Sequence, residues 1–211
     1  MCGRFEAKFN IPFSKSIWEI IGIPAPEMPD KVVEYKQKDV RPTNNILVIK
    51  KTENGFAYDV MKWGINVPLG AGKEFLMINS KTENIKIKTI WKNTLTKNPV
   101  LIPMTGFYEW KTEGKTKTPY KFTVKDKKIF FVAGYFRLEK DKKEPEKQIE
   151  CATIITTSGN DLTREIHPND RSPVILDYGD IHNFMNEDID VRLSLCEPFP
   201  AKEMSLTQSN P

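Results

Sequence analysis

The chain has 211 residues, of which 39% are hydrophobic and 28% charged, and it carries a net charge of +4. This length suits one domain with a substantial core, and the mild positive charge permits an acidic partner without requiring one. No charged flank precedes an apolar run at the N-terminus, and no stretch approaches about 18 apolar residues, which argues against a signal peptide and a membrane span. Three scattered cysteines, Cys2, Cys151 and Cys196, suggest neither a disulfide framework nor a metal site. We therefore expect one soluble, cytoplasmic domain over residues 1–211, without metal or cofactor.

The predicted elements are mostly strands. Ser14 is expected to cap a short helix through residues 17–21 that stops at Gly22 and Pro24. Strand patterns follow at residues 45–50, 56–63, 100–103, 107–110, 120–124, 129–136 and 151–157. Further helical patterns begin near Ser158 and Asp180, and the charged run 139–147 predicts a solvated hairpin loop. A core rich in β-sheet is expected.

One helix is expected between the strands. The run Ser80-Lys81-Thr82-Glu83 matches a capping box, in which the first side chain and the fourth satisfy backbone N–H groups of the opening turn. The spacing of Ile87, Ile90 and Trp91 places them toward the core.

The N-terminus carries the most distinctive chemistry. Excision of Met1, which is normal before a small side chain, would leave Cys2 with a free α-amine beside its thiol. Such a 1,2-aminothiol reacts twice with one aldehyde carbon: the amine, with a pKa of about 8, forms an imine, and the thiol, at about 8.5, then closes a thiazolidine ring. A cysteine at position 2 has no such role in most chains, so this chemistry needs further support.

Support comes from five blocks of sequence. They are Met1-Cys2-Gly3-Arg4-Phe5, Trp63-Gly64, Asn79-Ser80-Lys81-Thr82-Glu83, Leu101-Ile102-Pro103-Met104-Thr105-Gly106-Phe107-Tyr108-Glu109-Trp110, and His167 before Arg171-Ser172-Pro173-Val174-Ile175-Leu176. Together, in this order, they closely resemble the SRAP family, the SOS response-associated peptidase-like proteins. The resemblance extends over nearly the whole chain. It implies a monomeric, single-domain, β-rich α+β fold with barrel-like sheets and peripheral helices.

The resemblance also implies a function. Its members sense abasic sites in single-stranded DNA and crosslink to them through the N-terminal cysteine, which shields the lesion during replication. On this basis Cys2, Asn79, Glu109 and His167 are the expected catalytic residues, meeting at one cleft. The partner is single-stranded DNA with an abasic site, and the protein is expected to associate with the nucleoid when bound.

Two of these residues can be interpreted in more than one way. Glu109 stands between Tyr108 and Trp110, where burial would raise the pKa of its carboxyl and let it open the sugar hemiacetal by proton transfer. Alternatively, it is an exposed strand glutamate. Asn79 can orient the sugar hydroxyl or the Cys2 amine through its amide, or it can cap the following helix.

His167 depends on the resemblance alone, which assigns it proton transfer or binding of the lesion near Cys2. The spacing to Arg171 is longer than is usual in the family, which makes the placement of Arg171 uncertain.

DNA binding needs cations for the phosphates and apolar side chains for the bases. Arg4 and Arg171 are the first candidates for phosphates, followed by Lys81, which replaces the more usual arginine, and by Arg41 and Arg164. Trp63 is a candidate for base contact, with core packing as the alternative. The family commonly has a second tryptophan after the Trp-Gly pair, and Leu69 is the candidate apolar wedge there.

Two other functions remain open from the sequence. Cys2 can be the nucleophile of a peptidase, with Glu109 or His167 as base, acting on its own N-terminus or on another protein. The chain can also be a non-catalytic DNA-binding module. Crosslinking requires a free Cys2 amine, thiol proteolysis requires only the sulfur, and passive binding requires neither.

Overall fold

The computed structural model describes residues 2–28, 37–166 and 170–211. Its strands are β1 (Phe5–Ala7), β2 (Gln37–Val40), β3 (Asn45–Thr52), β4 (Gly55–Trp63), β5 (Ile65–Gly70), β6 (Lys73–Met77), β7 (Asn79–Lys81), β8 (Pro99–Met104), β9 (Gly106–Glu113), β10 (Thr116–Val124), β11 (Phe130–Lys140), β12 (Gln148–Ser158), β13 (Arg171–Pro173), β14 (Ile175–Leu176) and β15 (Met204–Gln208). Its helices are α1 (Lys15–Ile21), α2 (Thr82–Ile87), α3 (Thr89–Lys97), α4 (Asp161–Arg164), α5 (Tyr178–Asn186), α6 (Ile189–Ser194) and the 3-10 turn η1 (Ala201–Glu203).

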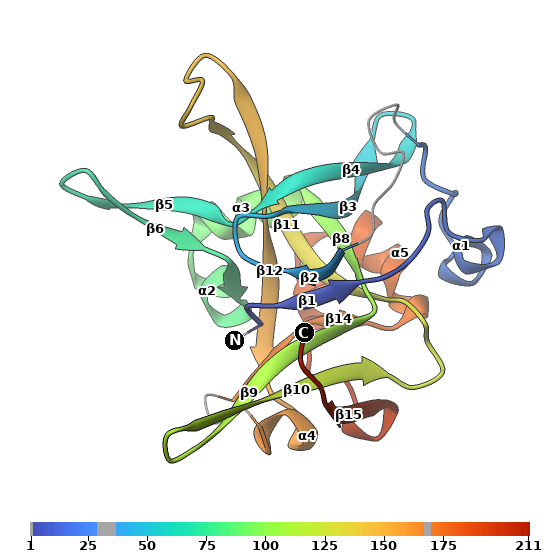
Figure 1. The fold of residues 1–211 in the computed structure, drawn as a ribbon. Helices are drawn as coiled ribbons and strands as arrows, with labels where there is room; N and C mark the ends of the chain where they lie inside the picture. The colour runs from blue at the N-terminus through green and yellow to red at the C-terminus, as the bar shows by residue number, and fades with distance from the viewer. Residues whose placement is uncertain (1, 29–36, 167–169) are drawn as a thin grey trace.

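Five of the described strands close a barrel. Strand β12 pairs with β4, β4 with β3, β3 with β8, β8 with β11, and β11 pairs back with β12. The barrel leaves little room at Gly134 of β11, where a Cβ atom would lie 2.7 Å from the Thr153 carbonyl oxygen and 2.9 Å from Ile102 Cδ1. The expected β-rich α+β fold with barrel-like sheets and peripheral helices is confirmed (Figure 1).

A second sheet carries the N-terminus. Its strand order is β15-β10-β9-β1-β2, and its neighbouring strands are antiparallel. The Phe107 and Phe122 rings stack within this sheet with centroids 4.9 Å apart. Phe5 of β1 packs against Trp63 of β4, with ring centroids 5.2 Å apart, so buried aromatic rings join the second sheet to the barrel.

The strand predictions from residue 45 to residue 157 are confirmed, with ends that differ by a few residues. Helix α1 is also confirmed, and it ends at Gly22, whose φ of 76° is the left-handed conformation that glycine adopts at little cost. Ser14 stands at its N-cap position, but the Ser14 side chain makes no capping hydrogen bond. Helices α4 and α5 lie near the starts predicted at Ser158 and Asp180. None of the described helices combines the length and apolar character that crossing a membrane requires.

The capping-box prediction is wrong. Helix α2 begins at Thr82, and the residue before it, Lys81, makes no side-chain capping bond. The Ser80 hydroxyl instead lies 2.8 Å from the Tyr135 hydroxyl, which donates to it in the core. Ile87 and Ile90 are 76% and 58% exposed, because the helical phase breaks at Lys88 between α2 and α3.

The solvated loop predicted at residues 139–147 needs a smaller correction. Strand β11 runs through Lys140, and the Glu139 side chain is only 7% exposed. Its carboxylate accepts hydrogen bonds from the Asn66 backbone N–H at 2.9 Å and from the Asn66 side chain at 2.7 Å. Glu139 thereby connects the β11–β12 hairpin to the β5–β6 hairpin, and both hairpins project from the body of the molecule (Figure 1).

Candidate active site

The site is built around the segment that leads into β1. Phe5 pairs with Phe107 of β9, and the Tyr108 N–H donates to the Arg4 carbonyl oxygen at 2.9 Å. This antiparallel pairing carries the chain from Arg4 back to Cys2 along the part of β9 that contains Glu109. The Cys2 residue is fully buried there.

Asn79 holds the Cys2 backbone from the barrel side. Its residue begins β7, which pairs in parallel with β12, and its Nδ2 donates to the Cys2 carbonyl oxygen at 2.9 Å. Its Oδ1 is buried and accepts no hydrogen bond from the described residues. A buried amide oxygen without a donor is costly, so this atom is suited to accept a bond from a ligand at the site. The helix-capping alternative is wrong, because the Asn79 side chain contacts Cys2.

Glu109 supplies the buried carboxyl. Its residue is 4% exposed, and burial raises its pKa above the ordinary value of 4.5. The exposed-strand alternative is therefore wrong for this glutamate. Burial, followed by the negative charge of Glu109, raises the pKa of the Cys2 thiol to about 12. The two groups are thus close enough to influence each other's protonation.

The structure brings together Cys2, from the segment before β1, Asn79 from β7 and Glu109 from β9. His167 lies outside the described residues, so its expected place at the same cleft stays a prediction. A pocket of about 350 Å³ adjoins Glu109 and is also lined by Trp110, Thr112 and Lys117. Cys2 and Asn79 are not among its lining residues, so a single cleft shared by all four residues stays a prediction.

A charged network flanks this site. The Arg4 guanidinium pairs with both oxygens of Asp39, at 2.7 Å for the Nη2–Oδ2 contact, and lies 5.7 Å from the Trp110 ring centroid. Arg41 reaches the same carboxylate, with Nη2 2.7 Å from Oδ2. The paired arginine holds the pKa of Asp39 at about 2. Asp39 thus orients two of the predicted phosphate-binding arginines.

Sequence reasoning assigned no role to Asp39. Trp110 ends the block 101–110 that carries part of the resemblance, but it was not named as a site residue. Their partners could not be inferred from the sequence, because the contact between Arg4 and Asp39 spans 35 residues of the chain.

The other predicted DNA-binding residues differ in exposure. Lys81 is exposed, and Leu69 of β5 is 64% exposed near the end of the β5–β6 hairpin, where Phe75 is also 43% exposed. Arg164 is half-exposed and pairs with Asp170 at 2.6 Å. Lys81 and Arg164 are thus accessible to a phosphate, and Leu69 is accessible to a base.

Two predicted DNA contacts need correction. Trp63 is fully buried, and its indole N–H donates to the Ile78 carbonyl oxygen at 2.9 Å, so the core-packing alternative describes it. Arg171 has a side chain only 10% exposed, and its guanidinium forms a bidentate pair with Glu83 at 2.7 and 3.1 Å while donating to the Thr156 carbonyl oxygen. In this conformation Arg171 orders α2 against β12 and presents little charge to a phosphate.

Comparison with known proteins supplies a family. The sequence pattern of the family described as SOS response associated peptidase (SRAP) matches residues 1–210. The abasic site processing protein YoqW of Bacillus subtilis (strain 168) is 32% identical over 176 residues, which cover 81% of this chain and 77% of that protein. The abasic site processing protein YoaM of the same organism is 31% identical over 182 residues, covering 83% and 78%.

Solved structures share the fold. A protein from Bacteroides thetaiotaomicron aligns with a TM-score of 0.77 at 23% identity, over 97% of this chain and 90% of its own. A phage-related protein from Bordetella bronchiseptica aligns with a TM-score of 0.75 at 22% identity, over 100% and 95%. With the family pattern extending over residues 1–210 and relatives above 30% identity over four-fifths of its length, the chain belongs to the SOS response associated peptidase (SRAP) family.

Proposed function

We propose that this protein crosslinks to abasic sites in single-stranded DNA through a thiazolidine formed by Cys2 after Met1 is removed. The observation that carries the proposal is the position of Cys2, held by Asn79 on one side and next to the buried carboxyl of Glu109 on the other. The names of the relatives, which are abasic site processing proteins, support an abasic lesion as the substrate.

The chemistry can be written in balanced steps. A protonated Glu109 carboxyl assists opening of the deoxyribose hemiacetal, which frees the aldehyde. The Cys2 amine then adds to the aldehyde carbon, and loss of one water leaves an imine. The thiol adds across the C=N bond, so that a C–S bond forms while the thiol proton ends on the nitrogen. No oxidant or cofactor enters the balance, and one water leaves.

The raised pKa values suit this order of events. With its pKa at about 12, the Cys2 thiol is protonated at neutral pH and has to lose its proton as the sulfur attacks. Glu109 gives a proton to the ring oxygen and takes one back from the C1 hydroxyl, or its equivalent, as the sugar opens. When it is ionised, it can take the thiol proton and pass it to the nitrogen, so that the net transfer is from sulfur to nitrogen. The burial that raises the pKa of Glu109 makes its protonated form easier to reach than that of an exposed carboxyl, which suits a group that gives and takes a proton.

The same pKa weighs against a general thiol peptidase. Such an enzyme needs a thiolate, which an adjacent cation normally stabilises by lowering the thiol pKa. Here burial and the negative charge of Glu109 raise the pKa of Cys2. Crosslinking differs from proteolysis in this respect, because the amine forms the imine first and the thiol does not have to be ionised beforehand.

The test mixes the mature protein, trimmed to Cys2, with single-stranded DNA that carries one abasic site. Denaturing gels should show a heat-resistant adduct, and its intact mass should be one water less than the sum of the two molecules. The Cys2→Ala variant, a Met1-retained form and undamaged DNA should give none. Cys2→Ser keeps the amine and should give a stable adduct only after borohydride reduction of its imine.

Two outcomes would overturn the proposal. Absence of an adduct from correctly trimmed protein would exclude the aminothiol mechanism. An adduct that the wild-type protein forms only after borohydride reduction would show that chemistry stops at the imine.

A further inference from the structure

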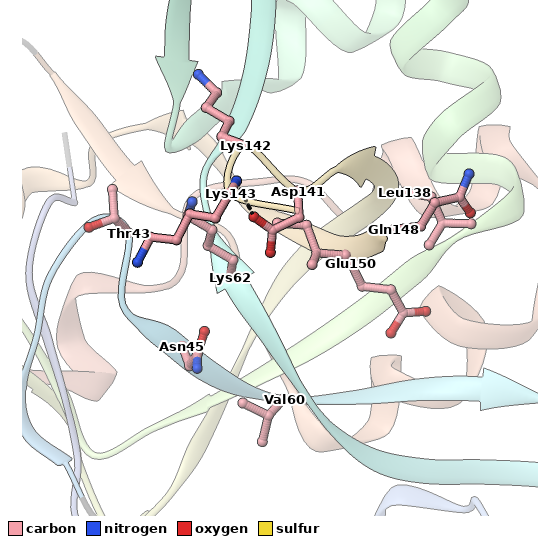
Figure 2. Close-up of a pocket in the computed structure, with 11 residues that line it drawn as sticks. Thr43, Asn45, Val60, Lys62, Leu138, Asp141, Lys142, Lys143, Gln148 and Glu150 are labelled. Atoms are coloured by element: carbon pink, nitrogen blue, oxygen red, sulfur yellow. Dashed lines mark hydrogen bonds between the residues drawn. The ribbon is translucent and has the colours of Figure 1, made fainter. Parts of the chain in front are cut away.

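A second hollow lies outside the site, between the β3–β4 pair and the loop end of the β11–β12 hairpin. Its volume is about 730 Å³. Polar and cationic residues supply much of its lining, and they include Thr43, Asn45, Lys62, Lys142, Lys143 and Gln148 (Figure 2). No aromatic side chain is among the residues that line it. We name this hollow the basic groove.

The cations of the basic groove differ in their partners. Lys142 pairs with Glu74 of β6 at 2.7 Å, and its ammonium points away from the hollow (Figure 2). Lys62 and Lys143 form no ion pair with any residue in the described part of the chain. Figure 2 shows the Lys143 ammonium pointing toward Thr43. Two unpaired ammonium groups thus remain available to an anion.

The acidic residues at the groove are already engaged. Both oxygens of Glu150 lie 2.8 Å from the Lys50 ammonium, which also contacts Asp59. Asp141 accepts the Lys143 backbone N–H at 2.8 Å, within the turn of the hairpin. Asp141 keeps its charge and interacts with Lys62 through space, and Glu150 shares the Lys50 ammonium with Asp59. Neither Asp141 nor Glu150 forms an ion pair with Lys62 or Lys143, so these two ammonium groups remain free to contact a phosphate.

A continuous chain of contacts joins the groove to the reactive cysteine. Arg4 and Arg41 share Asp39, and the Arg41 backbone N–H donates to the Asn44 side chain at 2.9 Å. The Thr43 N–H donates to the Trp63 carbonyl oxygen at 2.9 Å, directly after Lys62. Arg4, Arg41 and Lys62 therefore lie along one continuous set of contacts from the Cys2 segment to the basic groove, and Asp39 compensates one of the two guanidinium charges.

We propose that the DNA strand flanking the abasic site leaves the reactive site over Arg41 and lies in the basic groove, where Lys62 and Lys143 contact its phosphates. This inference rests on the proposed function. The absence of aromatic residues in the lining and the presence of ammonium groups indicate contacts to the backbone, which carry no sequence preference. The groove thus accounts for binding of flanking DNA, whatever its bases.

The test measures binding to single-stranded DNA at several salt concentrations by fluorescence anisotropy. The variant is Lys62→Gln/Lys143→Gln, and the matched control is Lys128→Gln/Lys202→Gln, which removes two exposed charges elsewhere. Loss of two phosphate contacts should reduce the slope of log K against log salt by about 1.4, at about 0.7 per contact on a single strand. The control should keep the wild-type slope, and unchanged melting temperatures would show that all three proteins are folded.

Oligonucleotides extended on only one side of the lesion sharpen the test. One of the two extensions should strengthen binding to wild-type protein, and the double variant should lose that gain. Equal slopes for variant and control, or an equal response to both extensions, would overturn the inference. Adduct formation with a short oligonucleotide tests the proposed function separately, because that substrate does not reach the groove.

Discussion

The burial of Glu109 raises the pKa of its carboxyl, and this burial lowers the folding stability of the protein at neutral pH. The folded-state pKa of the carboxyl is raised above 4.5, so the folded protein holds the proton more tightly than the unfolded chain does. Below pH 4.5 the carboxyl is protonated in both states. As pH rises through the folded pKa, ionisation in the folded state increasingly destabilises it.

Glu109→Gln should therefore raise the melting temperature at pH 7–8 and change it little near pH 4. Each 1 kcal/mol of relief raises the melting temperature of a protein of this size by about 2–4 °C. Thermal unfolding followed by circular dichroism across this pH range measures the effect. The same variant should form adducts far more slowly, and a melting temperature that falls equally at both pH values would contradict the argument.

Asn79 can be examined by two substitutions of different severity. Asn79→Ala removes the 2.9 Å bond to the Cys2 carbonyl oxygen, and loss of one such bond, at about 0.5–1.5 kcal/mol, should slow adduct formation by roughly 2–13-fold. Asn79→Asp should slow it further, because a carboxylate would face that carbonyl oxygen close to Glu109. Single-turnover rates of adduct formation, measured on gels of quenched samples, would rank the proteins. An Asn79→Asp rate equal to the wild-type rate would contradict this role.

The sequence identified residues by motif better than it placed their side chains. Cys2, Asn79 and Glu109 were found through the resemblance, and their contacts agree with a shared site. Trp63 and Arg171 were misjudged because the sequence does not show which side of a strand is covered by another element. Helix α2 covers Arg171 through Glu83, a contact across 88 residues.

Among the elements, the pairing of β1 with β2 depends on Asp39. The Arg4 guanidinium lowers the pKa of Asp39 from 3.8 to about 2, so its contribution to stability is present above pH 3.8 and is lost as pH falls toward about 2. Asp39→Asn should cost about 1–2 kcal/mol at pH 7, allowing for partial exposure.

Urea unfolding at pH 7 and pH 3 would measure this loss, which should shrink at the lower pH. Glu53→Gln, at an exposed glutamate in the β3–β4 turn, serves as control and should change little at either pH. A loss for Asp39→Asn that is the same at both pH values would show that packing, and not charge, is responsible.

The long strands were predictable and the short ones were not. Strands β3, β4, β11 and β12 carry enough apolar residues to show their pattern. Strands β1 and β7 have three residues each, too few for any periodicity, and they form because longer strands offer them partners. These two short strands position Cys2 and Asn79, so the geometry of the site was the part least visible in the sequence.

At the scale of the whole molecule, closure of the barrel depends on Gly134. A methyl group there would press on the Thr153 carbonyl oxygen across the β11–β12 pair, and Gly134→Ala should destabilise the protein by about 1–3 kcal/mol. Gly179→Ala in α5 is the matched control, since nothing lies within 4 Å of its added carbon.

Urea midpoints at a constant m-value would measure this difference. A Gly134→Ala midpoint no lower than that of the control would show that the barrel adjusts freely. One cooperative transition is expected for a single domain over residues 1–211, and light scattering should give the mass of a monomer.

The complete burial of Cys2 has a further consequence for how the protein persists before it meets a lesion. Burial and the negative charge of Glu109 raise the pKa of the Cys2 thiol to about 12, so at pH 7 the thiol is almost entirely protonated. Peroxides and alkylating agents react with the thiolate, and the surrounding side chains also keep them from the sulfur. If the proposed crosslink consumes the protein in one reaction, the burial that shapes the site also protects Cys2 from being spent on oxidants beforehand.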